Sequence, residues 1–456
     1  MSEEHKKVNE LIKKKNIRWV VLNFLDISGE QRCISLPASS FTEGNAWHGT
    51  DCDGSSVGFM TLEKSDMLLI PDPSSAWIDP FFKDRTLNVH ASTSTPDGVL
   101  MGPRSGLTRM LKEYDKLGFV PLISPEMEFS LYESIQQAII DNDVMGADMD
   151  WAGKNVIHSF FGFYDGASHP HRPKKAYLSS NINEDRREYR NDLSNLLTDI
   201  GYEIRYHHHE GGKRQLEIET GYFPAMKAAD FIANFKYLAR GLGKQHCLIP
   251  TFMAKPSAYD AGNGMHFHIR LMKGKQNAFS DKKGELNETA MQFIAGLMKH
   301  APAICSFTNP TINSYRRLMP GFQAPTAISW SRSNRTALIR VPASAKGPIN
   351  NVEIRNPDPS ANPYLATTAL LAAGLDGIKK KMKVPPESKG NLYKKNNLES
   401  LPSSLEDALV ATAKDSVIVN AIGADLFESF KAIKSKELSD YRKHVPIWDF
   451  NVYFNV

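Results

Sequence analysis

Four short segments of the chain carry ionisable side chains at a spacing of two residues. The pairs are Glu126 and Glu128, Glu217 and Glu219, His266 and His268, and Glu353 and Arg355. Because residues i and i+2 point to the same side of a β-strand, each segment predicts a strand with one apolar and one ionisable face. A half-exposed strand whose charged face meets water would explain any single pair. Four such strands together favour a shared site.

The chemistry of these side chains indicates a metal site. Clustered carboxylates repel one another unless a cation lies among them. Carboxylate oxygens combined with an imidazole suit magnesium or manganese better than zinc. The run from His207 to Glu210 adds one more candidate. Only Glu210 is counted as a ligand there, because the histidines of such a run also pack or form structural hydrogen bonds.

Several arginines lie in later segments, and they suit the same chemistry. They are Arg316, Arg317, Arg335, Arg340 and Arg355. Acidic metal ligands with arginines are what phosphoryl transfer requires, because metals bridge phosphates and guanidinium groups stabilise the transferring group. The chain contains neither a P-loop nor a G-x-G-x-x-G motif, which argues against the nucleotide sites built on them. The residues alone therefore predict a multi-metal phosphoryl-transfer enzyme.

Length and composition set the frame for such a site. The chain has 456 residues, enough for one large enzyme body or two domains. With 41% hydrophobic and 23% charged residues, it is unlike a collagen, a disulfide scaffold or a disordered chain. No stretch approaches the ~18 apolar residues of a membrane span, and the charged start lacks the apolar core of a secretory signal. We therefore expect a cytoplasmic chain without a membrane partner.

The charge balance and the cysteines agree with that expectation. Lys and Arg number 55 against 51 Asp and Glu, too even a balance to imply a nucleic-acid partner. The cysteines form no C-x-x-C pair and have no zinc-like spacing. They are Cys33, Cys52, Cys247 and Cys305. This pattern predicts ordinary buried thiols in a reducing compartment.

The first hundred residues predict a small sheet unit. Strand-like runs at 17–25, 31–36 and 66–70 are separated by turn signals at Asp26–Gly29 and Pro71–Pro73. Helical spacing begins at Pro103, so we expect a boundary near residue 102.

Beyond that boundary, strands intermix with helices. The helices are expected at 186–200, 224–243, 286–301, 361–383 and 403–443. The last of them should break near Gly423, and residues 377–399 predict an exposed loop rich in Lys, Pro and Asn.

Taken in chain order, these segments resemble the motifs of the glutamine synthetase family. Asp51–Ser56 resembles the D-G-S-S loop, Ser124–Phe129 the E-x-E-F strand, and Asn263–His268 the G-S-G-M-H-x-H segment. Further matches are H-H-E at 208–210, Q-x-E at 215–217, N-S-Y-K-R-L at 313–318, N-R-T at 334–336, and N-P-D-P with N-P-Y-L at 356–365. The likeness continues to the tail at Val445–Phe450, so it covers nearly the whole chain.

The resemblance implies an α+β fold with an amino-terminal β-grasp domain at 1–102 and a large α/β catalytic domain at 103–456. It implies a double-ring dodecamer of identical chains, with active sites between adjacent subunits. ATP and Mg²⁺ or Mn²⁺ would be the cofactors of a ligase. ATP would phosphorylate the γ-carboxylate of glutamate or a similar acid, and ammonium or a small organic amine would displace the phosphate.

Site residues follow from the resemblance by motif position. One metal would be held by Glu128, Glu210 and Glu217, and the other by Glu126, His266 and Glu353. Glutamate would contact Gly262 and Arg317. The phosphates and the transferred group would be held by Arg335, Arg340 and Arg355, with His268 beside the nucleotide. Two residues would act on the amine, namely Gln323 and the Asp53 of a neighbouring subunit.

The sequence departs from the family pattern around the same pocket. The flap motif P-G-Y-E-A-P contains Phe322 and Gln323 here. Gln323 cannot ionise, so it cannot accept a proton from ammonium, although Asp53 remains. Ala261 stands where the family has an asparagine beside glutamate. Four further departures are Arg205, Arg214, Arg270 and Asn351, and both Arg205 and Arg270 are expected near the nucleotide.

Three hypotheses remain open. The chain is an ordinary glutamate–ammonia ligase that tolerates Gln323, a ligase of the same chemistry for another amine or acid, or a silent paralogue that regulates a true synthetase. Tyr393 resembles a tyrosine that some members adenylylate. The Lys-Lys-Asn-Asn after it lacks the acidic context of that site, so we expect an exposed loop tyrosine.

Overall fold

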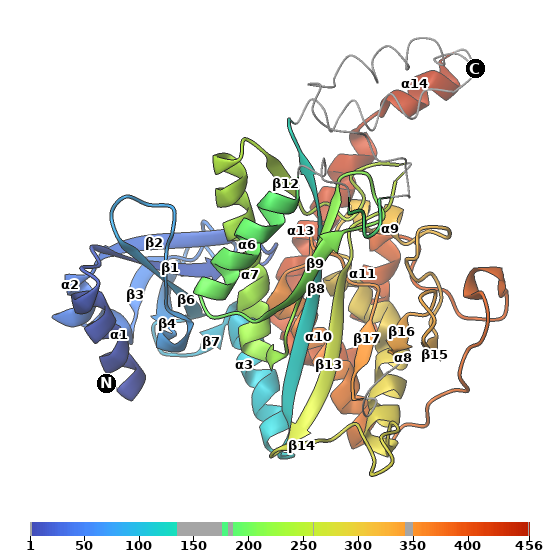
Figure 1. Ribbon diagram of the computed structural model, residues 1–456, viewed down its shortest axis with the longest axis horizontal. Coiled ribbons are helices and arrows are strands. Elements are labelled where there is room, and N and C mark those ends of the chain that lie inside the picture. The colour runs from blue at the N-terminus through green and yellow to red at the C-terminus, as the bar shows by residue number, and fades with distance from the viewer. Residues whose placement is uncertain (1, 135–175, 181–185, 259, 343–349, 455) are drawn as a thin grey trace.

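The computed structural model describes residues 2–134, 176–180, 186–258, 260–342, 350–454 and 456. Two β-sheets organise the chain, a smaller amino-terminal one and a larger central one (Figure 1). The predicted organisation, a small sheet unit followed by a larger unit of strands and helices, is confirmed. We propose residue 102 as the boundary, because the first sheet ends with Met101 and a helix begins at Gly102.

The first sheet has the strand order β2-β1-β6-β4-β3, with β5 and β7 also paired to β6. β1 runs antiparallel to β2 and parallel to β6. The strands are β1 (Trp19–Leu25), β2 (Gln31–Pro37), β3 (Thr50–Asp53), β4 (Asp66–Pro71), β5 (Trp77–Ile78), β6 (Thr86–Ser94) and β7 (Leu100–Met101). The unit also contains two α-helices, α1 (Glu3–Lys14) and α2 (Ser39–Thr42), and two short 3₁₀ helices, η1 (Ala46–His48) and η2 (Pro73–Ser75).

Helix α1 was not predicted from the sequence, because its residues are mostly polar or charged. Ser2 and His5 form a capping box at its start, and only Val8, Asn9 and Ile12 are buried. Val8 and Ile12 pack into the apolar core of the first sheet. A narrow apolar stripe of this kind is enough to hold a short helix against a sheet.

The second sheet has the strand order β15-β16-β17-β13-β8-β10-β9, with β11 and β12 paired to β8 and β14 to β13. Its strands are β8 (Val120–Tyr132), β9 (Ile204–His209), β10 (Gln215–Thr220), β11 (Phe223–Pro224), β12 (Ile249–Thr251), β13 (Met265–Lys273), β14 (Gln276–Asn277), β15 (Trp330–Arg332), β16 (Ile339–Val341) and β17 (Val352–Ile354). β17 ends at Ile354, so Arg355 follows this strand instead of lying on it.

Helices cover this sheet and build the main core. They are α3 (Gly102–Asp115), α6 (Arg187–Asp199), α7 (Ala225–Gln245), α8 (Glu288–Thr308), α9 (Ile312–Arg317), α10 (Pro363–Lys379), α11 (Leu405–Ala413), α12 (Ser416–Ile422), α13 (Ala424–Lys443) and α14 (Ile447–Tyr453). Within the described residues, none is both long and apolar enough to cross a membrane.

Most predicted helices are confirmed within a few residues, and the deviations have local causes. The helix expected at 286–301 continues to Thr308, whereas the one expected at 361–383 ends at Lys379. The segment 403–443 breaks at Gly423 as predicted, but also at Asp415. The Asp415 side chain accepts hydrogen bonds from the first amides of α12 and so starts a new helix there.

The central helix α10 is buried on nearly all sides and crosses α8 at a point lined by glycine. A Cβ atom on Gly296 would lie 2.1 Å from the carbonyl oxygen of Ala373, and one on Gly377 would lie 2.1 Å from that of Gln292. Only glycine allows the two backbones to approach so closely.

The two units meet at a buried network of charges. Arg104 of α3 bonds Asp230 of α7 at 3.0 Å and Asp72 of the first unit at 2.7 Å. Tyr364 of α10 donates to Asp230 at 2.7 Å. A further hydrogen bond links the two units, because the Asn362 side chain donates to the backbone carbonyl oxygen of Asp26 at 2.9 Å.

The cysteines differ in part from the sequence expectation. All four are free thiols, but only Cys305 is buried, and Cys33 and Cys247 are exposed. The expectation of buried thiols is therefore correct for Cys305 alone, since Cys52 is half-buried.

The junction can be tested by removing its cation. Arg104→Met leaves Asp230 buried without its partner, which should cost about 3–5 kcal/mol of folding stability. The control Arg18→Met breaks an exposed pair with Asp84, whose side chains are 68% and 53% exposed, and should cost less than about 1 kcal/mol. Urea unfolding of both variants measures the difference. Equal losses would contradict the role of the network.

Candidate active site

Strand pairing brings the ionisable faces together in the middle of the second sheet. β8 lies between β10 and β13, and the register places Glu126 opposite Glu219 on one side and opposite His266 on the other. Glu128 lies opposite Glu217. All five residues are at most 9% exposed. The polar faces predicted from the sequence are therefore buried against one another.

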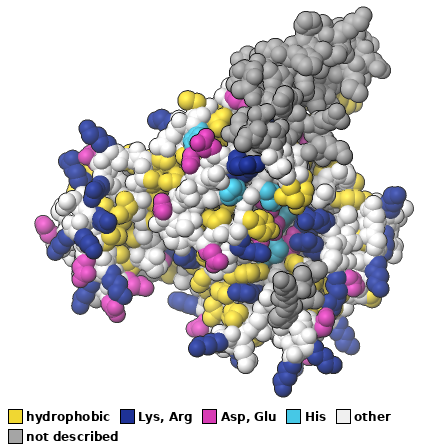
Figure 2. All heavy atoms as spheres, in the orientation of Figure 1, with side chains coloured by type: hydrophobic (Ala, Val, Ile, Leu, Met, Phe, Trp, Pro, Cys, Tyr) yellow, Lys and Arg dark blue, Asp and Glu magenta, His cyan; other side chains and the backbone are white. Residues whose placement is uncertain are grey.

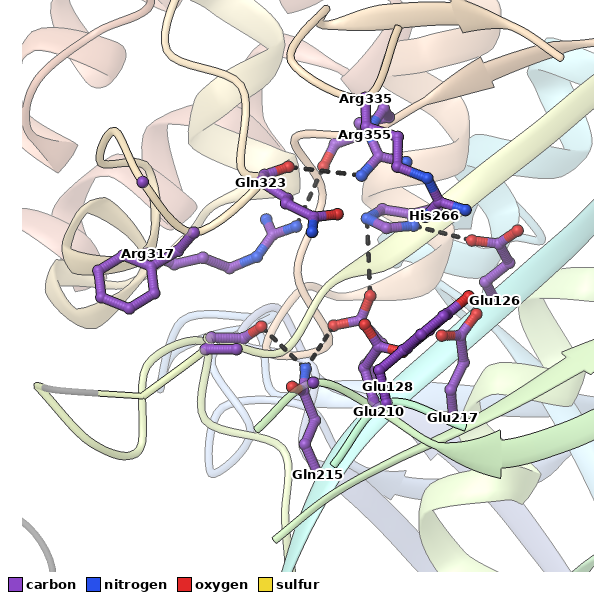
Figure 3. Close-up of a pocket in the computed structure, with 16 residues that line it drawn as sticks. Glu126, Glu128, Glu210, Gln215, Glu217, His266, Arg317, Gln323, Arg335 and Arg355 are labelled. Atoms are coloured by element: carbon purple, nitrogen blue, oxygen red, sulfur yellow. Dashed lines mark hydrogen bonds and ion pairs between the residues drawn. The ribbon is translucent and has the colours of Figure 1, made fainter. Parts of the chain in front are cut away.

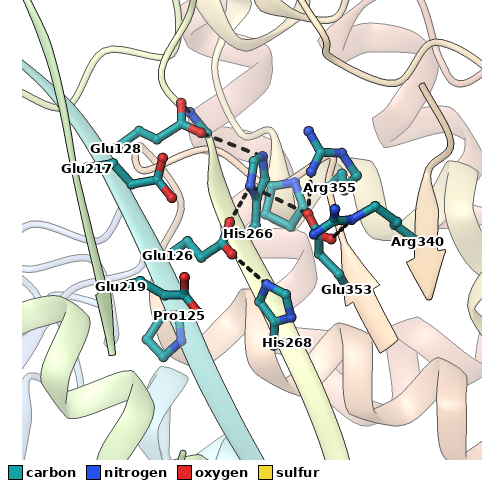
Figure 4. A network of polar contacts seen from close by, with 12 residues as sticks. Pro125, Glu126, Glu128, Glu217, Glu219, His266, His268, Arg340, Glu353 and Arg355 are labelled. Carbon is teal, nitrogen blue, oxygen red and sulfur yellow. Dashed lines mark hydrogen bonds and ion pairs between the residues drawn. The ribbon is translucent and has the colours of Figure 1, made fainter. Parts of the chain in front are cut away.

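The neighbouring strands extend this buried polar layer. β13 pairs with β17, where His268 lies opposite Glu353, and β17 pairs with β16, where Arg340 lies opposite Glu353. Figure 4 shows these side chains converging from separate strands on the carboxylates of Glu126 and Glu353.

One predicted ligand set is assembled by the fold. Glu126, His266 and Glu353 each offer a ligand atom, and these atoms lie within 4.8 Å of one another. His266 Nδ1 is 2.8 Å from Glu126 and 3.8 Å from Glu353. All three residues are buried, and Glu353 is completely so.

The other predicted set differs in one member. Glu210 and Glu217 lie within 4.8 Å of each other, but His208 completes their group. His208 Nε2 is 3.5 Å from Glu217, and His208 Nδ1 lies 3.1 Å from the carbonyl oxygen of His209. The predicted ligand Glu128 is not in this group, and its carboxylate accepts hydrogen bonds from the Gln215 side chain and the Gly264 amide, both at 2.7 Å.

A third group was not predicted. Glu126, Glu219 and His268 also place ligand atoms within 4.8 Å of one another. His268 Nε2 lies 2.6 Å from Glu126 Oε1, while Glu219 forms an ion pair with Arg205. The sequence signal for Glu219 was its spacing of two from Glu217.

The carboxylates of the two predicted sets differ in their counter-charges. Burial, with Glu128 nearby, raises the pKa of Glu210 to about 7. Burial and the neighbouring carboxylates also raise the pKa of Glu217 well above its usual value. Burial acts on Glu126 in the same direction, but the adjacent His268 and the hydrogen bonds from the histidines outweigh it, so its pKa is well below the usual value.

This donor set fits a divalent cation. Glu210 Oε2 is buried and accepts no hydrogen bond among the described residues. A buried carboxylate, Glu217, beside the half-buried Glu210 and His208 is a stable arrangement only when a proton or a metal ion neutralises the carboxylates.

Five of the six predicted metal ligands, all except Glu353, line a cavity of about 340 Å³. Figure 3 shows carboxylates on one wall of the cavity and Arg317, Arg335 and Arg355 on the other. In the space-filling view, histidine, acidic and basic side chains gather near the centre of the face that is shown (Figure 2). The predicted residues that line the cavity are Glu126, Glu128, Glu210, Glu217, Gly262, His266, Arg317, Gln323, Arg335 and Arg355.

Two glycines shape the cavity wall. A Cβ atom on Gly262 would lie 2.5 Å from the carbonyl oxygen of Ala254 and 2.8 Å from Arg317. A Cβ atom on Gly264 would lie 2.7 Å from both Arg317 and His266. Larger residues at these positions would displace the site side chains. The sequence prediction included Gly262, but it missed Gly264 in the same motif.

The predicted arginines hold different positions. Arg317 is buried and donates to the carbonyl oxygens of Arg355, Asn356 and Pro357 at 2.7–3.2 Å. These three bonds leave two of its five donors for a ligand. Arg340 and Arg355 both form ion pairs with Glu353, one to each carboxylate oxygen.

Four predicted residues do not line the cavity among the described residues, namely Asp53, His268, Arg340 and Glu353. His268, Arg340 and Glu353 lie directly behind it through the contacts given above. Asp53 lies on β3, at the edge of the first sheet, and is exposed. Hydrogen bonds from Ser55 and Ser56 lower the pKa of Asp53 to about 2, so its carboxylate is charged at neutral pH.

Three of the departures from the family pattern lie at the cavity. Ala261, Phe322 and Gln323 all line it. Gln323 has a positive φ of 58°, and its carbonyl oxygen accepts a hydrogen bond from Arg355 at 3.4 Å. The expected ionisable flap residue is thus replaced by a neutral amide in a pocket that also has apolar walls.

The other departures have structural partners. Arg205 pairs with Glu219, and Arg270 stacks over the ring of Tyr222 at 3.9 Å. Arg214 pairs with Glu133 at 2.5 Å. Asn351 Oδ1 lies 3.0 Å from His268 Nδ1 and so orients that imidazole.

The sequence prediction did not include Gln215 and Tyr177, which line the cavity, or His208, which lies beside Glu210 and Glu217. Gln215 had a signal in the Q-x-E match, and His208 in the H-H-E match. Tyr177 had none in the sequence, because it lies in a stretch without periodic pattern and reaches the site only through the fold.

Tyr393 corrects another expectation. It is half-buried instead of exposed, and its hydroxyl donates to the carbonyl oxygen of Ala324 at 2.9 Å. The Lys-rich loop that carries it therefore reaches back to the segment beside Gln323.

Comparison with known proteins agrees with the motifs. Residues 16–96 match the family model described as the glutamine synthetase β-Grasp domain, and residues 100–453 match the glutamine synthetase catalytic domain. The chain is 35% identical to a glutamine synthetase of Archaeoglobus fulgidus over 100% of this chain and 98% of the relative. It is 37% identical to one of Thermus thermophilus over 97% of each chain.

Solved structures share the fold. A structure named "GmaS/ADP complex-Conformation 1" superposes with a TM-score of 0.85 at 26% identity, covering 98% of this chain and 99% of the other. A cryoEM structure of Plasmodium falciparum glutamine synthetase has a TM-score of 0.87 at 23% identity and covers 99% of both chains.

The metal assignment can be tested by binding alone. Glu210→Gln removes one negative charge from the group with His208 and Glu217, and we expect Mn²⁺ affinity at one site to fall by at least about tenfold. The control Glu133→Gln changes a half-exposed carboxylate outside the three groups and should leave binding unchanged. Electron paramagnetic resonance of free Mn²⁺ measures both. Unchanged binding in Glu210→Gln would contradict the assignment.

Proposed function

Because the chain belongs to the glutamine synthetase family, whose members are ATP- and divalent-metal-dependent ligases, we propose that it joins an amine to the γ-carboxylate of glutamate. The product of the first step would be γ-glutamyl phosphate. The observation that carries the proposal is the cavity with grouped carboxylates and histidines on one wall and arginines on the other.

The metal ligands are assigned from the groups in the site. Glu210, Glu217 and His208 or Glu128 would hold one Mg²⁺ or Mn²⁺, and Glu126, His266 and Glu353 the other. When bound, the metals supply electrostatic stabilisation of the phosphate oxygens. The chain's own part is to hold these carboxylates in register, which the pairing of β8 with β10 and β13 does without any ligand.

Glutamate and the nucleotide would meet the arginine wall. The two unused donors of Arg317 would bind a carboxylate of glutamate, and Gly262 leaves the space that its backbone needs beside the ligand. Arg335 and Arg355 line the cavity and would stabilise the charge on the transferring group. Arg340 and His268 lie behind the cavity and would hold the phosphates of ATP. The ADP in the GmaS neighbour supports an adenine nucleotide.

The reaction has two balanced steps. A γ-carboxylate oxygen of glutamate would attack the γ-phosphorus of ATP, and the bond from that phosphorus to the β-γ bridging oxygen would break to release ADP. The amine nitrogen would then attack the carbonyl carbon of the acyl phosphate, and phosphate would leave with the electrons of the bond from that carbon to oxygen. The nitrogen must lose a proton, because only a neutral amine has the lone pair for attack.

The identity of the amine is the finer part of the proposal. Gln323 cannot take a proton or attract a cation, which makes an ammonium cage weaker. Ala261 and Phe322 give the same wall an apolar surface, which suits the carbon chain of a small organic amine. Ammonia and a small organic amine are both compatible with this pocket. A silent regulatory paralogue is less well supported, because a silent chain has no need of grouped buried carboxylates.

The assembly is proposed by family analogy as a double-ring dodecamer with sites between subunits. Asp53 is exposed at a sheet edge and does not line the cavity of its own chain among the described residues. Its place would be in the site of the adjacent subunit, where its carboxylate would bind and deprotonate the amine.

The proposal is tested by phosphate release from ATP. Purified protein with Mg²⁺ and glutamate is given ammonium or members of a panel of alkylamines, and the amide product is identified by mass spectrometry. Release with ammonium alone identifies an ammonia ligase, and release only with an organic amine identifies the second class. No ATP-dependent release with any amine, despite Mn²⁺ binding, would refute the ligase proposal.

The flap residue predicts the effect of one substitution. Gln323→Glu restores a carboxylate, so the ammonia-dependent rate at subsaturating ammonium should rise by about tenfold or more. Gln323→Met is the matched control, because it has similar size without a proton acceptor and should give no gain. Equal rates for Gln323→Glu and the unchanged protein at all ammonium concentrations would exclude the flap as the limiting residue.

The shared site predicts complementation between inactive chains. Arg335→Ala and Asp53→Ala chains should each be nearly inactive, and co-assembled mixtures should recover up to about a quarter of full activity, since one in four interfaces pairs two intact contributions. A mixture of Arg335→Ala with Arg355→Ala is the control, because both residues line the cavity of one chain. Recovery in the control, or none in the first mixture, would contradict the shared site.

A further inference from the structure

One buried lysine contacts the cavity wall from behind. Lys255 follows β12, is only 6% exposed and does not line the cavity among the described residues. Its Nζ atom lies 3.4 Å from the centre of the Phe322 ring, while Phe322 itself lines the cavity. This is a close cation–π contact from which water is largely excluded.

Lys255 is held firmly at its base. Its backbone amide donates to the Asn313 side chain at 2.8 Å, and Asn313 donates back to the Lys255 carbonyl oxygen at 2.9 Å. Its ammonium group also donates to the carbonyl oxygen of Asp260 at 2.5 Å. Lys255 therefore joins the segment before Ala261 to the segment that carries Phe322.

The segment 320–325 needs such support, because little of its own structure stabilises it. It lies between α9 and β15 without regular secondary structure. Gly321 and Gln323 have positive φ angles of 96° and 58°. In Gln323, which is not a glycine, this backbone conformation is strained. An unconstrained loop with this strain would open readily.

Two further contacts hold the backbone of the segment 320–325. The Tyr393 hydroxyl donates to the carbonyl oxygen of Ala324 at 2.9 Å. Arg355 donates to the carbonyl oxygen of Gln323 at 3.4 Å. Phe322, Gln323 and Ala324 are thus each contacted by a side chain from a different part of the chain. These side chains are those of Lys255, Arg355 and Tyr393, in that order.

We propose that Lys255 and Tyr393 are positioning residues that hold the segment 320–325 closed over the cavity, so that the acyl phosphate is protected from water until the amine attacks. The proposal rests on the proposed ligase function. Lys255 acts through the ring of Phe322, and Tyr393 acts through the backbone of Ala324. In the closed position the segment presents the Gln323 side chain to the cavity.

Protection from water has a measurable consequence. A γ-glutamyl phosphate that meets water is hydrolysed, with water supplying the oxygen and phosphate leaving, so ATP is consumed without amide formation. An open segment therefore raises the ratio of phosphate released to amide formed. A merely structural defect lowers both products together and leaves this ratio unchanged.

The test uses four single variants of the full-length protein and the double variant that combines Lys255→Met with Phe322→Leu. Lys255→Met removes the charge at similar length, and Lys255→Arg keeps it. Phe322→Leu removes the ring but leaves the bond from Lys255 to Asp260 in place. Tyr393→Phe removes only the hydroxyl. Two readouts are taken, namely hydrogen exchange of the peptide 319–326 without substrates and the phosphate-to-amide ratio during turnover.

Lys255→Met and Phe322→Leu should each raise exchange of the peptide by about tenfold and the phosphate-to-amide ratio several-fold, and the double variant should be no worse than either single one. Tyr393→Phe should raise both readouts by roughly two- to fivefold, as expected for one hydrogen bond. Lys255→Arg should stay close to the unchanged protein.

Other outcomes overturn the proposal. Unchanged exchange and ratio in both Lys255→Met and Tyr393→Phe would refute the positioning role. Equal disturbance in Lys255→Met and Lys255→Arg, with Phe322→Leu unaffected, would assign Lys255 to the Asp260 contact alone. If the unchanged protein releases no phosphate with any amine, the ligase proposal fails and the water-protection role falls with it. The exchange readout then still decides whether these residues hold the segment.

Discussion

The rest of the structure depends on the burial of charge between three paired strands. β8 carries Glu126 and Glu128 into the centre of the second sheet, where β10 and β13 place further carboxylates and histidines opposite them. Such a layer is costly unless each charge has a partner. Histidines and Arg340 and Arg355 neutralise one end of the layer. The end at Glu210 and Glu217 has no such ion pair with an arginine among the described contacts, and its ligand atoms lie close enough together to hold a cation.

The surrounding architecture keeps that layer rigid. The opposite faces of the same strands carry Met127 and Phe129, which are fully buried in the main core. The close crossing of α8 and α10 completes this core. The Arg104 network then fixes the small sheet unit to the large one. A one-residue slip in any of these strands would turn the carboxylates into the apolar core, so the register is strongly determined.

In the proposed ligase, the contrast between the fixed strands and the segment 320–325 would let one scaffold serve different amines. The proposed metal ligands lie on strands or directly after them, where packing holds them. Phe322 and Gln323, which would meet the amine, lie on a loop held by a few side-chain contacts. Substitutions there alter the acceptor pocket without disturbing the buried charges. The departures from the family pattern that line the cavity are in fact at Ala261, Phe322 and Gln323.

The sequence by itself determined the strand faces, because a period of two places Glu126 with Glu128, and His266 with His268, on one side whatever the tertiary fold. Its ordered motifs also determined the family and the order of a small sheet unit before a large one. Only the tertiary structure decided which carboxylates group together. It put His208 beside Glu210 and Glu217, tied Glu128 to Gln215, and brought Tyr177 and Tyr393 to the site. The reason is that strand spacing acts locally, whereas the distance between two side chains on different strands depends on register, twist and the hydrogen bonds that each group has already formed.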